Sequence, residues 1–160
     1  MNLQDYLIDP KGKDWSELLS DWHFLLPEEF TLWMVNRFGD LFIVTNDGAV
    51  HMLDVSGDRL NYLAASRDEF SDRIDVGQNA NTWLMIPLVD RCVAAGMRLG
   101  PGQCYSYKIA PMLGGGWELD NIEPADLARH YSFLASIARQ LKDVPDGGKI
   151  RIRIGPEPAA

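Results

Sequence analysis

Cysteine is scarce in this sequence, with only Cys92 and Cys104 in 160 residues. Two cysteines at this spacing form neither the dense disulfide framework of a small secreted domain nor a CxxC metal-binding pair. We therefore expect a reducing compartment, in which both thiols are small, partly buried hydrophobic side chains.

Long hydrophobic runs are also missing. The longest, residues 83–89, is interrupted by Pro87 and is far shorter than the roughly 20 residues of a membrane-spanning helix. The first residues do not combine a basic start with an apolar stretch, as a secretory signal peptide would. These absences predict a cytoplasmic protein with no membrane partner.

Positive charge is in deficit, with 15 Lys and Arg against 23 Asp and Glu, a net charge of −8 and a pI near 4.7. Binding to nucleic acid requires clustered Lys and Arg, so DNA and RNA are disfavoured as partners. An acidic surface suits a basic protein partner, because opposite fields accelerate association. The alternative is the ordinary acidity of many soluble proteins.

No catalytic or metal-binding pattern is present. His23, His51 and His130 are far apart and lack ligand spacing, so we expect them to be ordinary surface or boundary residues. Cys104 has neither a histidine nor a helix start beside it to activate the thiol. Residues 114–116 are three glycines, but no GxGxxG spacing or Lys-Ser/Thr follows, which favours a flexible turn or a close backbone approach over a phosphate site. The sequence predicts no catalytic residue, no metal and no cofactor.

Four strand-like runs occupy the first half of the chain. Turn residues separate them, and Asn46-Asp47-Gly48 is a strong hairpin signal because these residues tolerate the positive φ of a tight turn. No helix-length pattern lies between the runs, so a parallel sheet is disfavoured. The predicted strands are residues 31–35, 41–45, 49–55 and 59–64.

Helical patterns precede and follow these runs. Asp14 is a candidate cap for a short amphipathic helix that carries Trp15 and Trp22. Ser66 and Glu69 form a capping-box pattern at the start of a second helix, and residues 75–81 read as a loop. Residues 84–95 predict a third helix that ends at Gly96 and either begins at or is kinked by Pro87.

The last predicted helix is the most strongly patterned. Pro124 suits its first turn, and its buried stripe consists of Leu127, Tyr131, Leu134, Ile137, Ala138 and Leu141. A short strand is expected at the aromatic residues 105–107, and another at residues 149–154, where basic and apolar residues alternate.

These elements predict an α+β fold in a single domain: an antiparallel β-meander of about four to six strands with helices packed on one face. Residues 1–24 are expected to be a lead-in with a short helix, of which the first 13 form a loose arm. The domain itself is expected over residues 25–154, followed by a tail at 155–160.

The stretch 99–123 is the candidate binding site. Trp117 lies in its glycine-rich loop among acidic residues, a composition typical of a protein-binding hot spot. The predicted partner- or ligand-binding residues are Gln103, Tyr105, Tyr107, Trp117, Glu118, Asp120 and Asn121. An alternative is a pocket for a small molecule, lined by five of these: Gln103, Tyr105, Tyr107, Trp117 and Asn121.

Several motifs together resemble one protein family. They are Asn36-Arg-Phe-Gly-Asp40, Ser66 with Glu69-Phe70, Gly96, LGPGQCYSYK at 99–108, Leu113-Gly-Gly, Asn121-Ile-Glu123, and Gln140 with Pro145-Asp-Gly147. Over roughly residues 25–150 the chain is similar to the C-terminal domain of bacterial immunity proteins that protect against DNase effectors of type VI secretion systems. Longer family members have an additional domain before this one, whereas about 25 residues precede it here.

The resemblance implies a non-enzymatic cytoplasmic protein that binds and neutralises a cognate toxin. A DNase toxin must carry a basic DNA-binding face, which an acidic binder could cover. The resemblance assigns no catalytic residue. Two other hypotheses stay open: a small-molecule-binding module of unknown ligand, and an unrecognised hydrolase, which a burial-shifted carboxylate or a Cys–His contact would favour.

Overall fold

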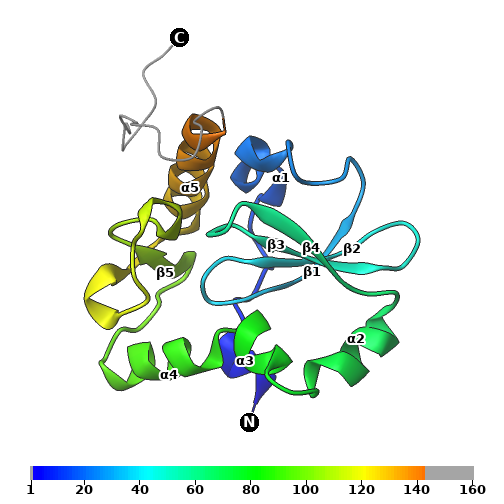
Figure 1. Ribbon diagram of the computed structural model, residues 1–160, viewed down its shortest axis with the longest axis horizontal. Coiled ribbons are helices and arrows are strands. Elements are labelled where there is room, and N and C mark those ends of the chain that lie inside the picture. The colour runs from blue at the N-terminus through cyan, green and yellow to red at the C-terminus, as the bar shows by residue number, and fades with distance from the viewer. Residues whose placement is uncertain (1, 143–160) are drawn as a thin grey trace.

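The computed structural model describes residues 2–142. Its first feature is a four-stranded sheet of β1 (Thr31–Val35), β2 (Leu41–Val44), β3 (Val50–Asp54) and β4 (Arg59–Ala64), paired in the order β1-β2-β3-β4. Every neighbouring pair is antiparallel. The predicted α+β class and antiparallel meander are therefore confirmed (Figure 1).

Helices cover both faces of this sheet (Figure 1), so the prediction that they pack on one face is wrong in this detail. The α-helices are α1 (Trp15–Leu18), α2 (Arg67–Ile74), α3 (Asn79–Trp83), α4 (Ile86–Ala94) and α5 (Leu127–Leu141). Because side chains alternate along a strand, Leu41 and Ile43 belong to the larger core with α5, while Phe42 between them packs in the smaller one with α2.

A second, two-stranded sheet pairs β5 (Gln103–Tyr107) with β6 (Ile122–Asp126). The prediction that the last helix begins around Pro124 is wrong, because β6 occupies that position and α5 begins at Leu127. Pro124 lies opposite Tyr105, whose N–H points away from β6 to the Arg37 carbonyl at 2.8 Å. In this register no hydrogen bond between β5 and β6 requires an N–H at position 124, so proline fits the strand.

The N-terminal residues are attached to the sheet. The 3₁₀ helix η1 (Leu3–Tyr6) leads to Ile8, whose N–H donates to the Val35 carbonyl at 2.8 Å. The Tyr6 hydroxyl also donates to Asp90 of α4 at 2.7 Å. This differs from the expected loose arm, because hydrogen bonds to β1 and α4 fix the segment.

Residues just after α1 complete the larger core. Leu19 and Trp22 are buried, and the indole N–H of Trp22, in η2 (Ser20–Trp22), donates to the Tyr131 carbonyl at 3.1 Å. Asp14 caps α1 as predicted, accepting from the Glu17 N–H at 3.2 Å.

The helices of the middle segment mostly follow the prediction. Ser66 accepts from the Glu69 N–H at 3.1 Å, and the Glu69 carboxylate accepts from the Ala65 N–H at 2.7 Å. The helix α4 begins immediately before Pro87, which settles the alternative between a start and a kink. The expected loop at 75–81 is partly wrong, because α3 begins at Asn79.

Two further 3₁₀ helices, η3 (Pro111–Leu113) and η4 (Leu119–Asn121), lie between β5 and β6. Within residues 2–142, no helix is long and apolar enough to cross a bilayer. The strand predicted at 149–154, the tail at 155–160 and the motif residues 145–147 lie outside the described residues.

Candidate functional site

The turn between β1 and β2, residues 36–40, is the centre of the buried polar structure. The Asn36 side-chain oxygen accepts from the N–H groups of Phe38 and Asp40, each at 3.0 Å. Its amide nitrogen donates to the Asp40 carboxyl and to the Trp83 carbonyl, also at 3.0 Å. Asn36 is fully buried, so these four bonds satisfy the hydrogen-bonding capacity of its side chain.

Asp40 is a buried carboxyl group within this turn. It accepts from Asn36 and from the Val55 N–H at 3.1 Å, which connects the turn to the end of β3. Burial, with a smaller contribution from Asp54, raises the pKa of Asp40 to about 7. Both carboxyl oxygens are engaged with the protein itself, so the group is held as a structural link.

His130 of α5 also contacts this turn. Its Nε2 lies 2.8 Å from the Phe38 carbonyl and its Nδ1 lies 2.7 Å from the Ser106 hydroxyl. A carbonyl can only accept, so Nε2 carries the hydrogen and Nδ1 accepts from Ser106. Burial lowers the pKa of His130 to about 4, which keeps the imidazole neutral.

Two further contacts hold the turn against α5. The Tyr131 hydroxyl donates to the Gly39 carbonyl at 2.7 Å. Gly39 has φ +83°, and a Cβ there would lie 2.9 Å from Cδ2 of His130. Glycine is thus required at this position both for its backbone conformation and for the space that the imidazole occupies.

The Ser106–His130 pair has the distance of a nucleophile and its base, but its surroundings are those of a core. His130 is 0% exposed and Ser106 is 4% exposed. The expectation that His130 is a surface or boundary residue is wrong. His130 lies three residues after Leu127 and four before Leu134, on the buried stripe of α5. This spacing in the sequence could have predicted that it is buried.

Of the predicted binding residues, the two tyrosines belong to the core. Tyr105 is 0% exposed and its hydroxyl donates to the Met97 carbonyl at 2.6 Å. Tyr107 is 3% exposed and packs between Phe38 and Trp117. Burial raises the pKa of both phenols. Both side chains are therefore part of the core, and Tyr107 contacts the partly exposed Trp117 from within it.

Gln103 and Asn121 organise loops. The side-chain oxygen Oε1 of Gln103 accepts from the Gly100 N–H at 2.8 Å. The Asn121 side chain accepts from the Ile109 N–H and donates to the carbonyls of Ile109 and Gly116, each at 2.9 Å. Asn121 thereby connects Ile109 with Gly116, the residue immediately before Trp117.

Trp117, Glu118 and Asp120 form the exposed part of the predicted site. Trp117 is 42% exposed, and its ring meets Tyr107 edge-on with ring centroids 5.4 Å apart. A side chain at Gly115 would overlap the Ile109 carbonyl, so this glycine is required by a close backbone approach, whereas Gly114 has φ +90°. This agrees with the preferred interpretation of residues 114–116 as a turn or a close backbone approach.

A shallow groove of about 220 Å³ separates Trp117 from the start of α4. Met85 lies in this groove with φ +52°, an uncommon backbone conformation for a long side chain. The lining residues are Asn81, Thr82, Met85, Pro87, Leu88, Arg91 and Trp117. Of the five residues expected to line a small-molecule pocket, Trp117 alone lines one of the three described grooves.

Metal ligands do not gather in the described part of the chain, where no group of three or more His, Cys, Asp or Glu could hold an ion. Cys92 and Cys104 are buried free thiols, and burial raises the pKa of both.

Comparison with known protein families gives a match over part of the chain. Residues 64–138 match the family model described as T6SS immunity protein Tdi1, C-terminal. This confirms, for that segment, the resemblance inferred from the motifs. No curated protein and no solved structure matches the chain.

Proposed function

We propose that this chain, whose residues 64–138 match the type VI secretion immunity family, is a cytoplasmic immunity protein that binds a cognate toxin and blocks it without catalysis. The family match is the observation that carries the proposal. The groove beside Trp117 supports it, because all of its lining residues fall between positions 81 and 117, inside the matched segment.

The finer proposal is that the toxin is a nuclease with a basic substrate-binding face. The net charge of −8 supports this, since an acidic binder is attracted to such a face and excludes the nucleic acid from it. Association would then be fast at low ionic strength and slower in salt, because exposed charges are screened.

The proposed contact surface is centred on Trp117, with Glu118 and Asp120 beside it. A partly exposed tryptophan supported by Tyr107 is pre-organised and loses little conformational freedom on binding. The carboxylates of Glu118 and Asp120 form no ion pair within residues 2–142, so they can pair with basic residues of the toxin. Gln103, Tyr105, Tyr107 and Asn121 would act by holding this surface in place.

Co-purification tests the proposed function. The tagged chain is used to capture the toxin encoded beside its gene, at low and at moderate salt, and its addition to the purified toxin is tested for inhibition. We expect a stoichiometric complex and loss of toxin activity. Absence of both would refute the immunity function, whereas capture of a toxin that does not cleave DNA would refute only its assignment as a nuclease.

Paired substitutions test the contact surface. Trp117→Ala should weaken toxin binding by about 30-fold or more, since hot-spot aromatics contribute at least about 2 kcal/mol. The control is Tyr62→Ala on β4, an aromatic residue that is 57% exposed and lies outside the matched segment. Equal affinity of the two variants, measured by calorimetry, would place the toxin elsewhere.

A further inference from the structure

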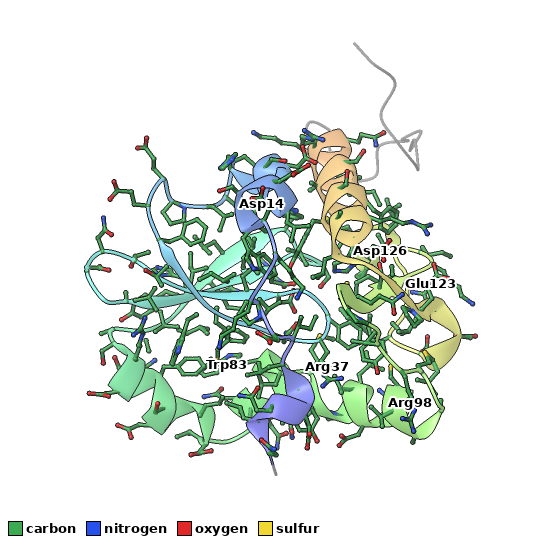
Figure 2. All side chains as sticks on the ribbon, turned by 180° about the vertical axis from the view of Figure 1, so that it is seen from behind. Asp14, Arg37, Trp83, Arg98, Glu123 and Asp126 are labelled. Carbon is green, nitrogen blue, oxygen red and sulfur yellow. The ribbon has the colours of Figure 1, made fainter. Side chains whose placement is uncertain are left out.

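A second and larger groove, of about 600 Å³, lies between α1 and the N-terminal half of α5. Asp14 stands at the start of α1 and Asp126 immediately before α5 (Figure 2). The apolar side chains of Leu18, Leu127 and Ala128 also line it. The groove therefore presents carboxylates beside an apolar floor.

The lining of this groove is strongly acidic. It contains four carboxylates, Asp14, Glu17, Asp21 and Asp126, against one ammonium group, Lys13, which is a formal charge of −3. Asp21 pairs with Arg139 at 3.7 Å. Within residues 2–142, the carboxylates of Glu17 and Asp126 form no ion pair, so their charge is available to an occupant.

The chain itself contains a segment of complementary chemistry. Residues 149–153, with the sequence Lys-Ile-Arg-Ile-Arg, carry three positive charges and no acidic residue. Their basic and apolar residues alternate, so an extended segment would direct cations and isoleucines to opposite sides. This pattern matches a groove that offers both carboxylates and apolar side chains.

The connecting length suffices for this segment to reach the groove. The ion pair of Arg139 with Asp21 places the last turn of α5 at one end of the groove. The distance along α5 from Leu127 to Leu141 is about 21 Å, at 1.5 Å per residue. Seven residues lead from Lys142 to Lys149 and can extend to about 23 Å.

We propose that residues 149–153 bind intramolecularly in the acidic groove between α1 and α5. The three cations approach Glu17, Asp126 and their neighbours, and the isoleucines contact the apolar lining. This inference does not rest on the proposed toxin, because it concerns two parts of one chain. Its consequence is that the groove is charge-neutralised by the chain itself, which leaves the surface around Trp117 to external partners.

Paramagnetic relaxation in the full chain tests the proposal. Ile152→Cys is labelled with a nitroxide, and the two native thiols do not compete because they are 0% exposed and thiolates are the reactive form. At low salt we expect the amide signals of Glu17 and Ala128 to lose intensity. At about 1 M salt, where the screening length falls to about 3 Å, the signals should recover.

Charge variants decide between specific binding and mere tethering. Glu17→Lys with Asp126→Lys should abolish the low-salt broadening, and additional K149E, R151E and R153E changes should restore it. The control Glu28→Lys with Glu29→Lys changes two exposed acids outside the groove and should leave the broadening intact.

Three results would overturn the proposal. The first is an absence of broadening in the groove, and the second is broadening that the charge-reversed groove retains. The third is broadening of an unlabelled isotopic sample mixed with labelled protein, since that would show a second copy of the chain as the occupant.

Discussion

Acidification should destabilise this protein through His130 in a way that one substitution can isolate. The buried imidazole is neutral, with Nε2–H donating to the Phe38 carbonyl and Nδ1 accepting from Ser106. The folded state therefore resists its protonation, whereas the unfolded chain accepts a proton at the ordinary pKa of about 6.5. Replacing His130 by Gln removes this titration.

The size of the effect follows from the two pKa values. Burial lowers the pKa from 6.5 to about 4, and each unit corresponds to about 1.4 kcal/mol. Because the folded pKa is depressed, the stabilisation from the neutral ring is complete above pH 6.5 and is lost as the pH falls towards 4. The wild-type chain should lose roughly 3 kcal/mol relative to His130→Gln over this interval.

Urea unfolding between pH 4 and 7.5, followed by tryptophan fluorescence, measures this difference. At pH 7 the variant should be the less stable protein, because buried hydrogen bonds are lost, and the gap should shrink by about 1.4 kcal/mol per unit below pH 6.5. His23→Gln, which changes an exposed histidine, is the control for the loss of a histidine as such. A wild-type-to-variant gap that is constant from pH 4 to 7.5 would refute the reasoning.

Three further predictions concern the same turn and one helix start. Asp40→Asn should show the opposite slope in the same titration, because burial raises the pKa of Asp40 in the folded wild type to about 7. The wild type should therefore lose stability relative to the variant as the pH rises from 4 to 7. A stability difference that does not change with pH would contradict this. Gly39→Ala and Gly96→Ala both place alanine at φ +83°, but the new Cβ meets His130 only at position 39. Gly39→Ala should therefore be at least about 1 kcal/mol less stable than Gly96→Ala in thermal unfolding. Equal melting temperatures of the two variants would argue against the clash. Ser66→Ala should cost about 1 kcal/mol through loss of the N-cap; thermal unfolding measures this, and a change of only a few tenths would show that the cap contributes little.

The meander could be predicted because its determinants are local. The expected bounds 31–35 and 59–64 coincide with β1 and β4, since alternating side chains and turn residues encode them within a few positions. The capping box at Ser66 was found for the same reason. Each signal lies within one element and its flanking turn.

The strand β6 could not be predicted, because its determinant is distant in the sequence. Pro124 is compatible with the first turn of a helix and with an edge strand. The choice depends on pairing with β5, where the Tyr105 N–H is directed to the Arg37 carbonyl. No window around Pro124 contains that information.

The candidate site was predicted in part. Trp117 is exposed in a glycine-rich loop, as its neighbours indicated. The aromatic residues of β5 suggested a binding strand, but Tyr105 and Tyr107 are buried because the turn at 36–40 and His130 pack over them. Exposure of a strand depends on which other segments cover it, and the sequence around β5 does not specify them.

The hydrogen bonds between the 36–40 turn and α5 also define the folding unit. The segment 64–138 that matches the family begins at the last residue of β4, yet its residues His130 and Tyr131 are satisfied by carbonyls of Phe38 and Gly39. Expressed alone, it would lack these two acceptors and three of the four meander strands, so apolar side chains of α5 would be exposed. A chain cleaved after Ala65, by contrast, yields two fragments that each carry part of both cores, which makes this position suited to a split protein that regains its structure only when both fragments are present.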